Sequence, residues 1–249
     1  MTLRQLRYEN RSFWRNPASA GFTFAFPLMF LVIFNGLFGG TVETFGRETS
    51  ASNFYVPAVA TFSVITASFT NLAISVSFLR DEGILKRIRG TPLPTFAYLL
   101  GRVIHATLIA ILLVIIVSAF GVFFYDVDVP TETLPAFVLI VLVGAASFCA
   151  LGLAFTAIVP NADAAPPMVN FAILPLLFIS DVFIPLDQAP EWLVTVSKVF
   201  PVKHYSAAML AAFNPFDPSF KGGELLAVAI WGVIGLVLAV KFFSWEPKR

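Results

Sequence analysis

Side chains that could do acid–base or nucleophilic chemistry are scarce in the apolar parts of this 249-residue chain. Residues 54–79, 134–159, 165–180 and 225–240 contain no Asp, Glu, Lys, Arg or His. Serines occur there, but a serine needs an adjacent base before it can act as a nucleophile. The sequence therefore argues against an intramembrane hydrolase. It also argues against coupling to protons or sodium ions, which uses ionisable residues inside the membrane.

Three ionisable residues lie near the ends of apolar stretches. His105 is either a proton site or a structural histidine, Arg102 lies just before it, and Asp181 is expected to anchor the segment that follows. The phosphate-binding motif G-x-x-x-x-G-K-[ST] is absent, so this chain cannot hold ATP through such a loop. The single cysteine, Cys149, has no zinc-ligand spacing around it. We therefore predict no catalytic residue, no metal and no cofactor bound by this chain.

Composition indicates which environment the chain occupies. Hydrophobic residues make up 58% of the sequence and charged residues 12%, with a net charge of +1. Soluble domains contain about 25% charged residues, so most of this surface cannot face water. Nucleic-acid binding requires a basic face, which the net charge does not provide. We expect a polytopic membrane protein in contact with membrane lipids and without a nucleic-acid partner.

Six apolar runs are long enough to be considered as membrane spans, which need about 20 residues each. The polar segments between them are too short for a separate soluble domain, so residues 1–249 form a single transmembrane domain. The predicted fold class is therefore an all-α membrane protein with six transmembrane helices. The expected spans are 17–38, 54–79, 96–124, 134–159, 165–183 and 225–243.

Basic residues are distributed unevenly between the alternating polar segments. One set comprises the N-terminus, residues 80–95, residues 160–164 and the C-terminus, and it holds most of the Lys and Arg residues. Basic residues favour the cytoplasmic side of a membrane. We therefore predict a multi-pass protein of the cytoplasmic (plasma) membrane with both termini in the cytoplasm.

The first 15 residues predict an amphipathic helix at the membrane surface. At about 100° per residue, four arginines fall on one stripe and apolar side chains fall on the adjoining one. Such a helix lies on the inner leaflet with its arginines toward lipid phosphates. It either fixes the topology alone or also has a mechanical role. The arginines of this stripe are Arg4, Arg7, Arg11 and Arg15.

The stretch LRDEGILKRIRGTPLP, residues 79–94, concentrates charge between two apolar runs. A helix can continue to residue 89, and the Gly-Thr-Pro sequence at 90–92 would end it. Its apolar face, rimmed by charge, suits docking to a cytosolic partner. A basic loop that only fixes the topology explains the composition equally well. The apolar face consists of Ile84, Leu85 and Ile88.

Residues 184–224 are too polar to span a membrane and too apolar to form a free loop. Two short helices are expected there, Glu191–Phe200 and Val202–Phe213, next to Pro190 and Pro201, because proline suits a first helical turn. We predict an extracellular re-entrant or interfacial helix pair before the last span, packed on protein and not on lipid.

The charged stretch and its continuation, RDEGILKRIRGTPLP…YLLGRV, resemble the cytoplasmic loop of ABC-2 type transporter permeases. RNP before the first span and IPLDQAPEWLVTVSKVFPVKHYSAAML before the last are also similar to patterns of that family. Together, in this order, the motifs extend the resemblance over nearly the whole chain. The matching loop residues are Glu82, Gly83, Leu85, Thr91, Pro92, Leu93, Leu99, Leu100 and Gly101.

The resemblance implies partners. The six spans would form one half of a transmembrane unit, paired with a second permease half that is identical or paralogous. A cytosolic ABC ATPase subunit would bind beneath each half and would hold ATP and Mg. The short charged helix would be the coupling helix, seated in a groove of that ATPase. The residues assigned to this contact are Glu82, Gly83, Ile84, Leu85, Arg87 and Ile88.

In the family the second and fifth spans line the transport path. A path rich in phenylalanine suits a hydrophobic or amphiphilic compound, although the same side chains can face lipid or pack helices. Asn71 and Asn170 are the polar candidates, because a buried amide needs a partner, and an interhelical hydrogen bond explains them equally well. The path candidates are Phe62, Thr66, Phe69, Thr70, Asn71, Asn170, Phe171, Leu174 and Phe178.

These features together predict a non-catalytic permease subunit of an ATP-driven exporter of a drug or lipid. One alternative is a permease for a polysaccharide or glycolipid, which would need an aromatic-lined channel. The chain has only four tryptophans, and none lies deep in a span. The other alternative is a stand-alone secondary transporter or channel that works without an ATPase.

Overall fold

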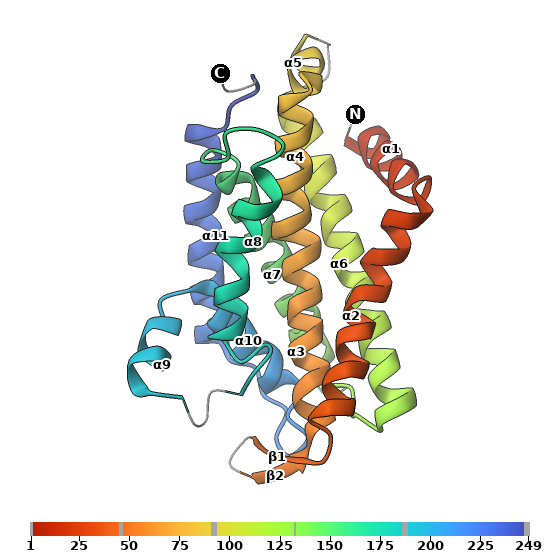
Figure 1. The fold of residues 1–249 in the computed structure, drawn as a ribbon, viewed down its shortest axis with the longest axis vertical. Helices are drawn as coiled ribbons and strands as arrows, with labels where there is room; N and C mark the ends of the chain where they lie inside the picture. Colours follow the sequence, from red (N-terminus) through yellow and green to blue (C-terminus); the bar gives the residue numbers. More distant parts are fainter. Residues whose placement is uncertain (1, 45–46, 91–93, 132, 186–188, 247–249) are drawn as a thin grey trace.

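The structure, a computed structural model, describes residues 2–44, 47–90, 94–131, 133–185 and 189–246. The described chain is mostly helical and forms an elongated bundle (Figure 1). Its elements are α1 (Thr2–Trp14), α2 (Pro17–Leu37), β1 (Thr41–Thr44), β2 (Arg47–Ser50), α3 (Ala51–Ile65), the π-helix η1 (Thr66–Thr70), α4 (Asn71–Asp81), α5 (Ile84–Arg89), α6 (Thr95–Tyr125), α7 (Leu134–Phe155), α8 (Ala165–Phe178), α9 (Glu191–Ser197), α10 (Pro201–Ala212) and α11 (Gly222–Phe242).

Five apolar helical segments are long enough to cross a membrane: α2, α6, α7, α11 and the continuous rod α3–η1–α4 (residues 51–81). The chain is thus a multi-pass membrane protein. The segment expected to be the fifth span differs, because α8 has only 14 residues. At 1.5 Å per residue it is about 21 Å long, shorter than a hydrocarbon core of about 30 Å. The helix ends at Phe178, and Asp181 adopts a left-handed backbone with φ of 53°. In the part of the chain that the structure describes, the six expected spans thus correspond to five long apolar helices and the shorter α8.

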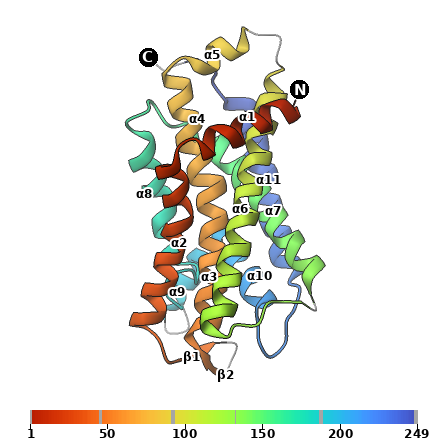
Figure 2. The same ribbon diagram turned by 90° about the vertical axis from the view of Figure 1, so that its right-hand side faces the viewer.

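The two chain ends lie at the same end of the bundle as α5 and the connection between α7 and α8 (Figure 1). The β-hairpin and α9 lie toward the opposite end. This arrangement matches the grouping of segments that was predicted from the basic residues. Helix α1 runs across the end of the bundle and not along it (Figure 2).

The prediction of an all-α fold is wrong at residues 41–50, which form a small antiparallel hairpin. Strand β1 pairs with β2 so that Thr41 lies opposite Ser50 and Thr44 lies opposite Arg47. The strands are polar and only four residues long, and the positive φ of Gly40, 122°, turns the chain into β1. So short a polar segment shows no clear alternation of apolar and polar residues.

Serine and threonine hydroxyls bond to the backbone where α3 turns into the π-helix η1. The Thr66 hydroxyl donates to the Phe62 carbonyl oxygen at 2.9 Å, and the Ser68 hydroxyl donates to the carbonyl of Val64. Hydroxyls that bond back into the preceding turn bend helices and disturb their hydrogen-bond ladder. Single π-helical turns are frequent at functional sites.

The two short helices expected before the last span are present as α9 and α10, and Pro201 is the first residue of α10. Most of α10 is buried, with Tyr205 and Met209 fully inaccessible. It packs among α3, α7 and α11. On α7, Gly144 leaves the space for Tyr205, because a Cβ there would lie 2.2 Å from the tyrosine ring.

Candidate functional site

The short charged helix, expected to contact an ATPase, is α5. Gly83 joins it to α4 with φ of 71°, a conformation that glycine adopts without strain. The expected exposed apolar face is wrong at Leu85, which is fully buried, and Ile88 also packs against the chain's own core. Ile84 is half-buried. The apolar side of α5 therefore fixes this helix to its own bundle.

The exposed side of α5 is charged. Glu82, Lys86, Arg87 and Arg89 are all exposed. At about 100° per residue, Arg87 lies almost opposite the buried Leu85. A partner that approached α5 from the end of the bundle would therefore meet charged side chains first.

A buried arginine in the last turn of α4, just before α5, joins α4 to the segment at the C-terminal end of α7. The Arg80 guanidinium is 1% exposed, and it donates to the carbonyl oxygens of Thr156 at 2.7 Å and Val159 at 2.5 Å. The Asp81 carboxylate accepts from the Ala162 amide at 3.0 Å. Carbonyls at a helix end lack partners within the helix, so these bonds complete the end of α7. From the sequence, Arg80 was only one of the basic residues that predict which segments face the cytoplasm.

The four arginines of the predicted membrane-surface helix are all exposed, three of them on α1 and the fourth directly after its end. On its inner side, Leu6 and Phe13 are half-buried. Gly101 of α6 allows a close approach, since a Cβ there would lie 2.8 Å from Cγ of Gln5. Contact of the arginines with lipid stays a prediction. The exposed arginines are Arg4, Arg7, Arg11 and Arg15.

A polar cavity of about 220 Å³ lies between α1, α2, α4 and α6. Arg102 donates from Nη2 to the Ser75 hydroxyl at 2.9 Å and from Nη1 to the Tyr98 hydroxyl at 3.0 Å. Oε2 of Glu9 lies 4.0 Å from Arg102 Nη2. Sequence reasoning noted Arg102 and His105 but missed Glu9, whose place beside them depends on how α1 packs. The polar side chains that line this cavity are Glu9, Ser12, Asn16, Ser19, Asn71, Ser75, Arg102 and His105.

The path candidates from the second span do not gather in one site. Phe62 is buried in an aromatic cluster, with ring centroids 5.6 Å from Phe30 and 5.5 Å from Phe183. Phe69 lines an apolar cavity, whereas Asn71 is exposed at the polar one. The two remaining candidates, Thr66 and Thr70, are half-buried in η1.

The candidates from the fifth span share one exposed face of α8. Phe171 is 83% exposed, Leu174 is 42% exposed and Phe178 is 50% exposed. Asn170 is exposed beside them. Phe178 also touches the aromatic cluster, 5.0 Å from Phe183. This face is not covered by other described parts of the chain.

An apolar cavity of about 350 Å³ lies between η1, α7, α8 and α11, next to the start of α10. Among the sequence-predicted path residues, only Phe69 lines it. The cavity offers an apolar surface of phenylalanine and aliphatic side chains. Its principal lining residues are Phe69, Phe148, Phe155, Ile173, Val202 and Trp231.

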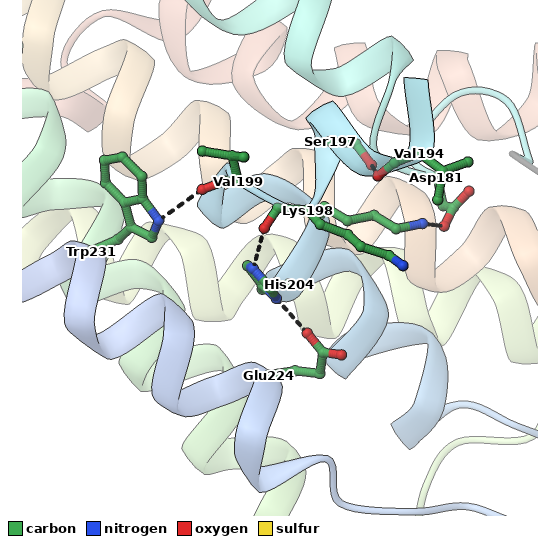
Figure 3. A network of polar contacts seen from close by, with 9 residues as sticks. Asp181, Val194, Ser197, Lys198, Val199, His204, Glu224 and Trp231 are labelled. Atoms are coloured by element: carbon green, nitrogen blue, oxygen red, sulfur yellow. Dashed lines mark hydrogen bonds and ion pairs between the residues drawn. The ribbon is translucent and has the colours of Figure 1, made fainter. Parts of the chain in front are cut away.

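Polar contacts join α10 to its neighbours toward the end of the bundle opposite α5 (Figure 3). Lys203 pairs with the Asp181 carboxylate, and the Ser206 hydroxyl donates to the Asp181 carbonyl oxygen at 2.9 Å. His204 Nδ1 lies 2.5 Å from Glu224 Oε2 of α11. The expectation that Asp181 anchors the following helices is confirmed.

Comparison with known proteins shows to which family this chain is similar. The family model described as ABC-2 type transporter matches residues 3–214. The chain is 26% identical over 225 residues to "Putative transport permease ycf38" of Porphyra purpurea, covering 90% of this chain and 76% of that protein. It is 24% identical over 167 residues to "Putative transport permease YvfS" of Bacillus subtilis (strain 168), covering 67% and 68%.

A further relative is "Probable multidrug ABC transporter permease YbhR" of Escherichia coli (strain K12), 22% identical over 153 residues. That match covers 61% of this chain and 41% of the relative. The match to the family model extends from α1 to the second residue after the end of α10. This chain therefore belongs to the ABC-2 type transporter family and is a membrane transport component.

Proposed function

We propose that this chain is the permease subunit of an ATP-driven exporter of a hydrophobic or amphiphilic compound, a drug or a lipid. A separate cytosolic ABC ATPase holds ATP and Mg, and a second permease half completes the unit. The absent phosphate-binding motif supports this division of labour. The multidrug permease named among the relatives supports the substrate class.

The attachment of α5 is the single observation that carries the proposal. Helix α5 follows the 31-residue rod α3–η1–α4, and Leu85 seats it in the bundle while Arg80 binds the end of α7. A displacement of α5 would therefore be passed to at least two spans. A loop that only fixed the topology would need neither a buried leucine nor a buried arginine.

In this proposal the end of the bundle with both termini and α5 faces the cytoplasm, in agreement with its excess of basic residues. The exposed face of α8 turns toward the second permease half and the transport path. Asn170 supports this orientation, because an amide facing lipid tails has no hydrogen-bond partner. The apolar cavity beside η1 provides a surface for the hydrophobic part of the compound.

The proposal is tested by reversing one charge on α5. Arg87→Glu changes an exposed side chain opposite Leu85, so the fold should be retained. We expect retention of a candidate ABC ATPase, and the ATP hydrolysis that depends on the permease, to fall about tenfold, which corresponds to about 1.4 kcal/mol. The measurement is co-purification followed by ATPase activity in lipid nanodiscs.

Asp163→Lys is the matched control, because it changes an exposed charge at the same end but outside α5. It should leave ATPase retention near the wild-type level. If wild-type permease binds no ABC ATPase, or if Arg87→Glu and Asp163→Lys retain it equally, docking on α5 is wrong. Leu85→Asp is unsuitable, since a buried carboxylate would disturb the bundle itself.

A further inference from the structure

The polar cavity beneath α1 has a charged floor and an uncharged polar rim. The side chains of Glu9 and Arg102 are 14% and 11% exposed, so both charges lie largely out of water. Exposed polar side chains surround them. These rim residues are Ser12, Asn16, Ser19 and Asn71.

Several of these polar groups have hydrogen-bonding capacity left. Among the described residues, the Ser12 hydroxyl, the His105 ring and the Asn71 amide have no hydrogen-bond partner. The Glu9 carboxylate accepts one bond, from Gln5 at 2.8 Å, and lies 4.0 Å from Arg102. A carboxylate can accept about four hydrogen bonds. The cavity therefore presents a separate anion and cation that are only loosely paired with each other.

Aromatic side chains lie directly beside this polar cavity. The Phe13 and Trp14 rings are 5.3 Å apart, and Phe24 of α2 stacks on Trp14 at 5.7 Å. Phe22, also on α2, is 74% exposed. Tryptophan concentrates where lipid head groups meet the hydrocarbon. Since α1 lies across the end of the bundle (Figure 2), we expect the cavity beneath it to lie at the depth of the lipid head groups.

We propose that this cavity binds the head group of a zwitterionic phospholipid that carries a primary ammonium and a phosphate. The ammonium donates to Glu9 and to the oxygen of Asn71, and the phosphate accepts from Arg102 and the Ser12 hydroxyl. The volume of about 220 Å³ equals that of about seven water molecules, which is enough for such a group. An anionic lipid without the ammonium would place its phosphate near Glu9 without neutralising that carboxylate.

The test uses native mass spectrometry of the purified permease with an equimolar mixture of dioleoyl phosphatidylethanolamine and dioleoyl phosphatidylglycerol. Wild-type protein should retain phosphatidylethanolamine in preference. Glu9→Gln keeps the size of the side chain but removes its charge, and it should reduce the ratio of the two lipids about tenfold. Asn71→Leu should reduce the retention of phosphatidylethanolamine by a smaller factor.

Asp163→Asn is the matched control, because it removes an exposed carboxylate at the same end outside the cavity. It should keep the wild-type lipid ratio. The proposal is overturned if wild-type protein retains both lipids equally or favours phosphatidylglycerol, or if Glu9→Gln keeps the wild-type ratio. A wild-type melting temperature for each variant verifies its fold. The experiment uses neither ATP nor an ATPase, so its outcome is independent of docking on α5.

Discussion

Helices α8 and α11 both leave one face uncovered in the single chain, but the two faces differ in chemistry. Apart from Lys241 in its last turn, the exposed large side chains of α11 are apolar, among them Val233 and Val237, and the helix has 21 residues. Helix α8 has 14 residues, and Asn170 lies beside Phe171 on its exposed face. A long, apolar face suits lipid, whereas a short face with an amide suits contact with protein or with a transported compound.

The inner faces of these helices differ as well. Helix α11 packs closely on α7 through two glycines. A Cβ on Gly232 would lie 2.4 Å from the Ser147 hydroxyl, and one on Gly235 would lie 2.8 Å from the backbone nitrogen of Leu151. Helix α8 contains no glycine, and it lines the apolar cavity together with α11. Helix α11 is therefore held closely against α7, whereas contact of α8 with a partner or a transported compound stays a proposal.

The largest change in stability is expected where α11 packs closely on α7. Gly235→Leu places a side chain against the α7 backbone, so we expect the free energy of unfolding to fall by about 3 kcal/mol. On α8, Ala172→Leu adds atoms to the side of the apolar cavity and should change stability little. Thermal unfolding in detergent measures both. Equal losses would show that α8 is packed as tightly as α11.

A second prediction concerns what covers the two exposed faces. We expect benzoylphenylalanine at Phe171 to form protein cross-links in native membranes, whereas the same group at Val237 should react mainly with lipid. Gel electrophoresis after illumination should show several-fold more cross-linked protein for position 171. The assay detects an identical or a paralogous second half alike. Equal yields at both positions would remove the distinction between the faces.

The long helices could be predicted from the sequence, because each is an apolar run of about membrane length. The shortness of α8 could not, since its apolar run continues to residue 183 while the helix ends at 178. Asp181 adopts its left-handed backbone within a network that joins it to α10. The apolar face of α5 was predicted correctly as a pattern, but a pattern does not reveal what covers Leu85.

The candidate sites were less predictable for a similar reason. Arg80 binds carbonyl oxygens of the backbone, and every residue has one, so no sequence signal identifies them. Glu9 meets Arg102 only because α1 folds back across α6. Positive charge near a span end predicts topology well, yet the same charge in a buried network has a second role that depends on tertiary structure.

Helix α10 is attached to α11 and to the segment after α8 by different polar contacts. His204 lies 2.5 Å from Glu224 of α11 through Nδ1 and 2.8 Å from the Lys198 carbonyl oxygen through Nε2. A carboxylate and a carbonyl oxygen both accept, so both contacts form as hydrogen bonds only when both ring nitrogens carry hydrogen. Lys203, by contrast, pairs with Asp181 beyond the end of α8. The attachment to α11 therefore runs through a histidine that lies between two acceptors, whereas the attachment to the segment after α8 is a direct ion pair.

The expected effects are small, because both pairs are partly exposed. His204→Gln should lower the free energy of unfolding by about 1 kcal/mol, because the shorter amide cannot contact both Glu224 and the Lys198 carbonyl oxygen. Lys203→Gln should cost a similar amount through the loss of its ion pair with Asp181. Melting temperatures of both variants and of wild type in the same detergent measure the two losses. A wild-type melting temperature for either variant would show that its pair does not help to hold α10 in place.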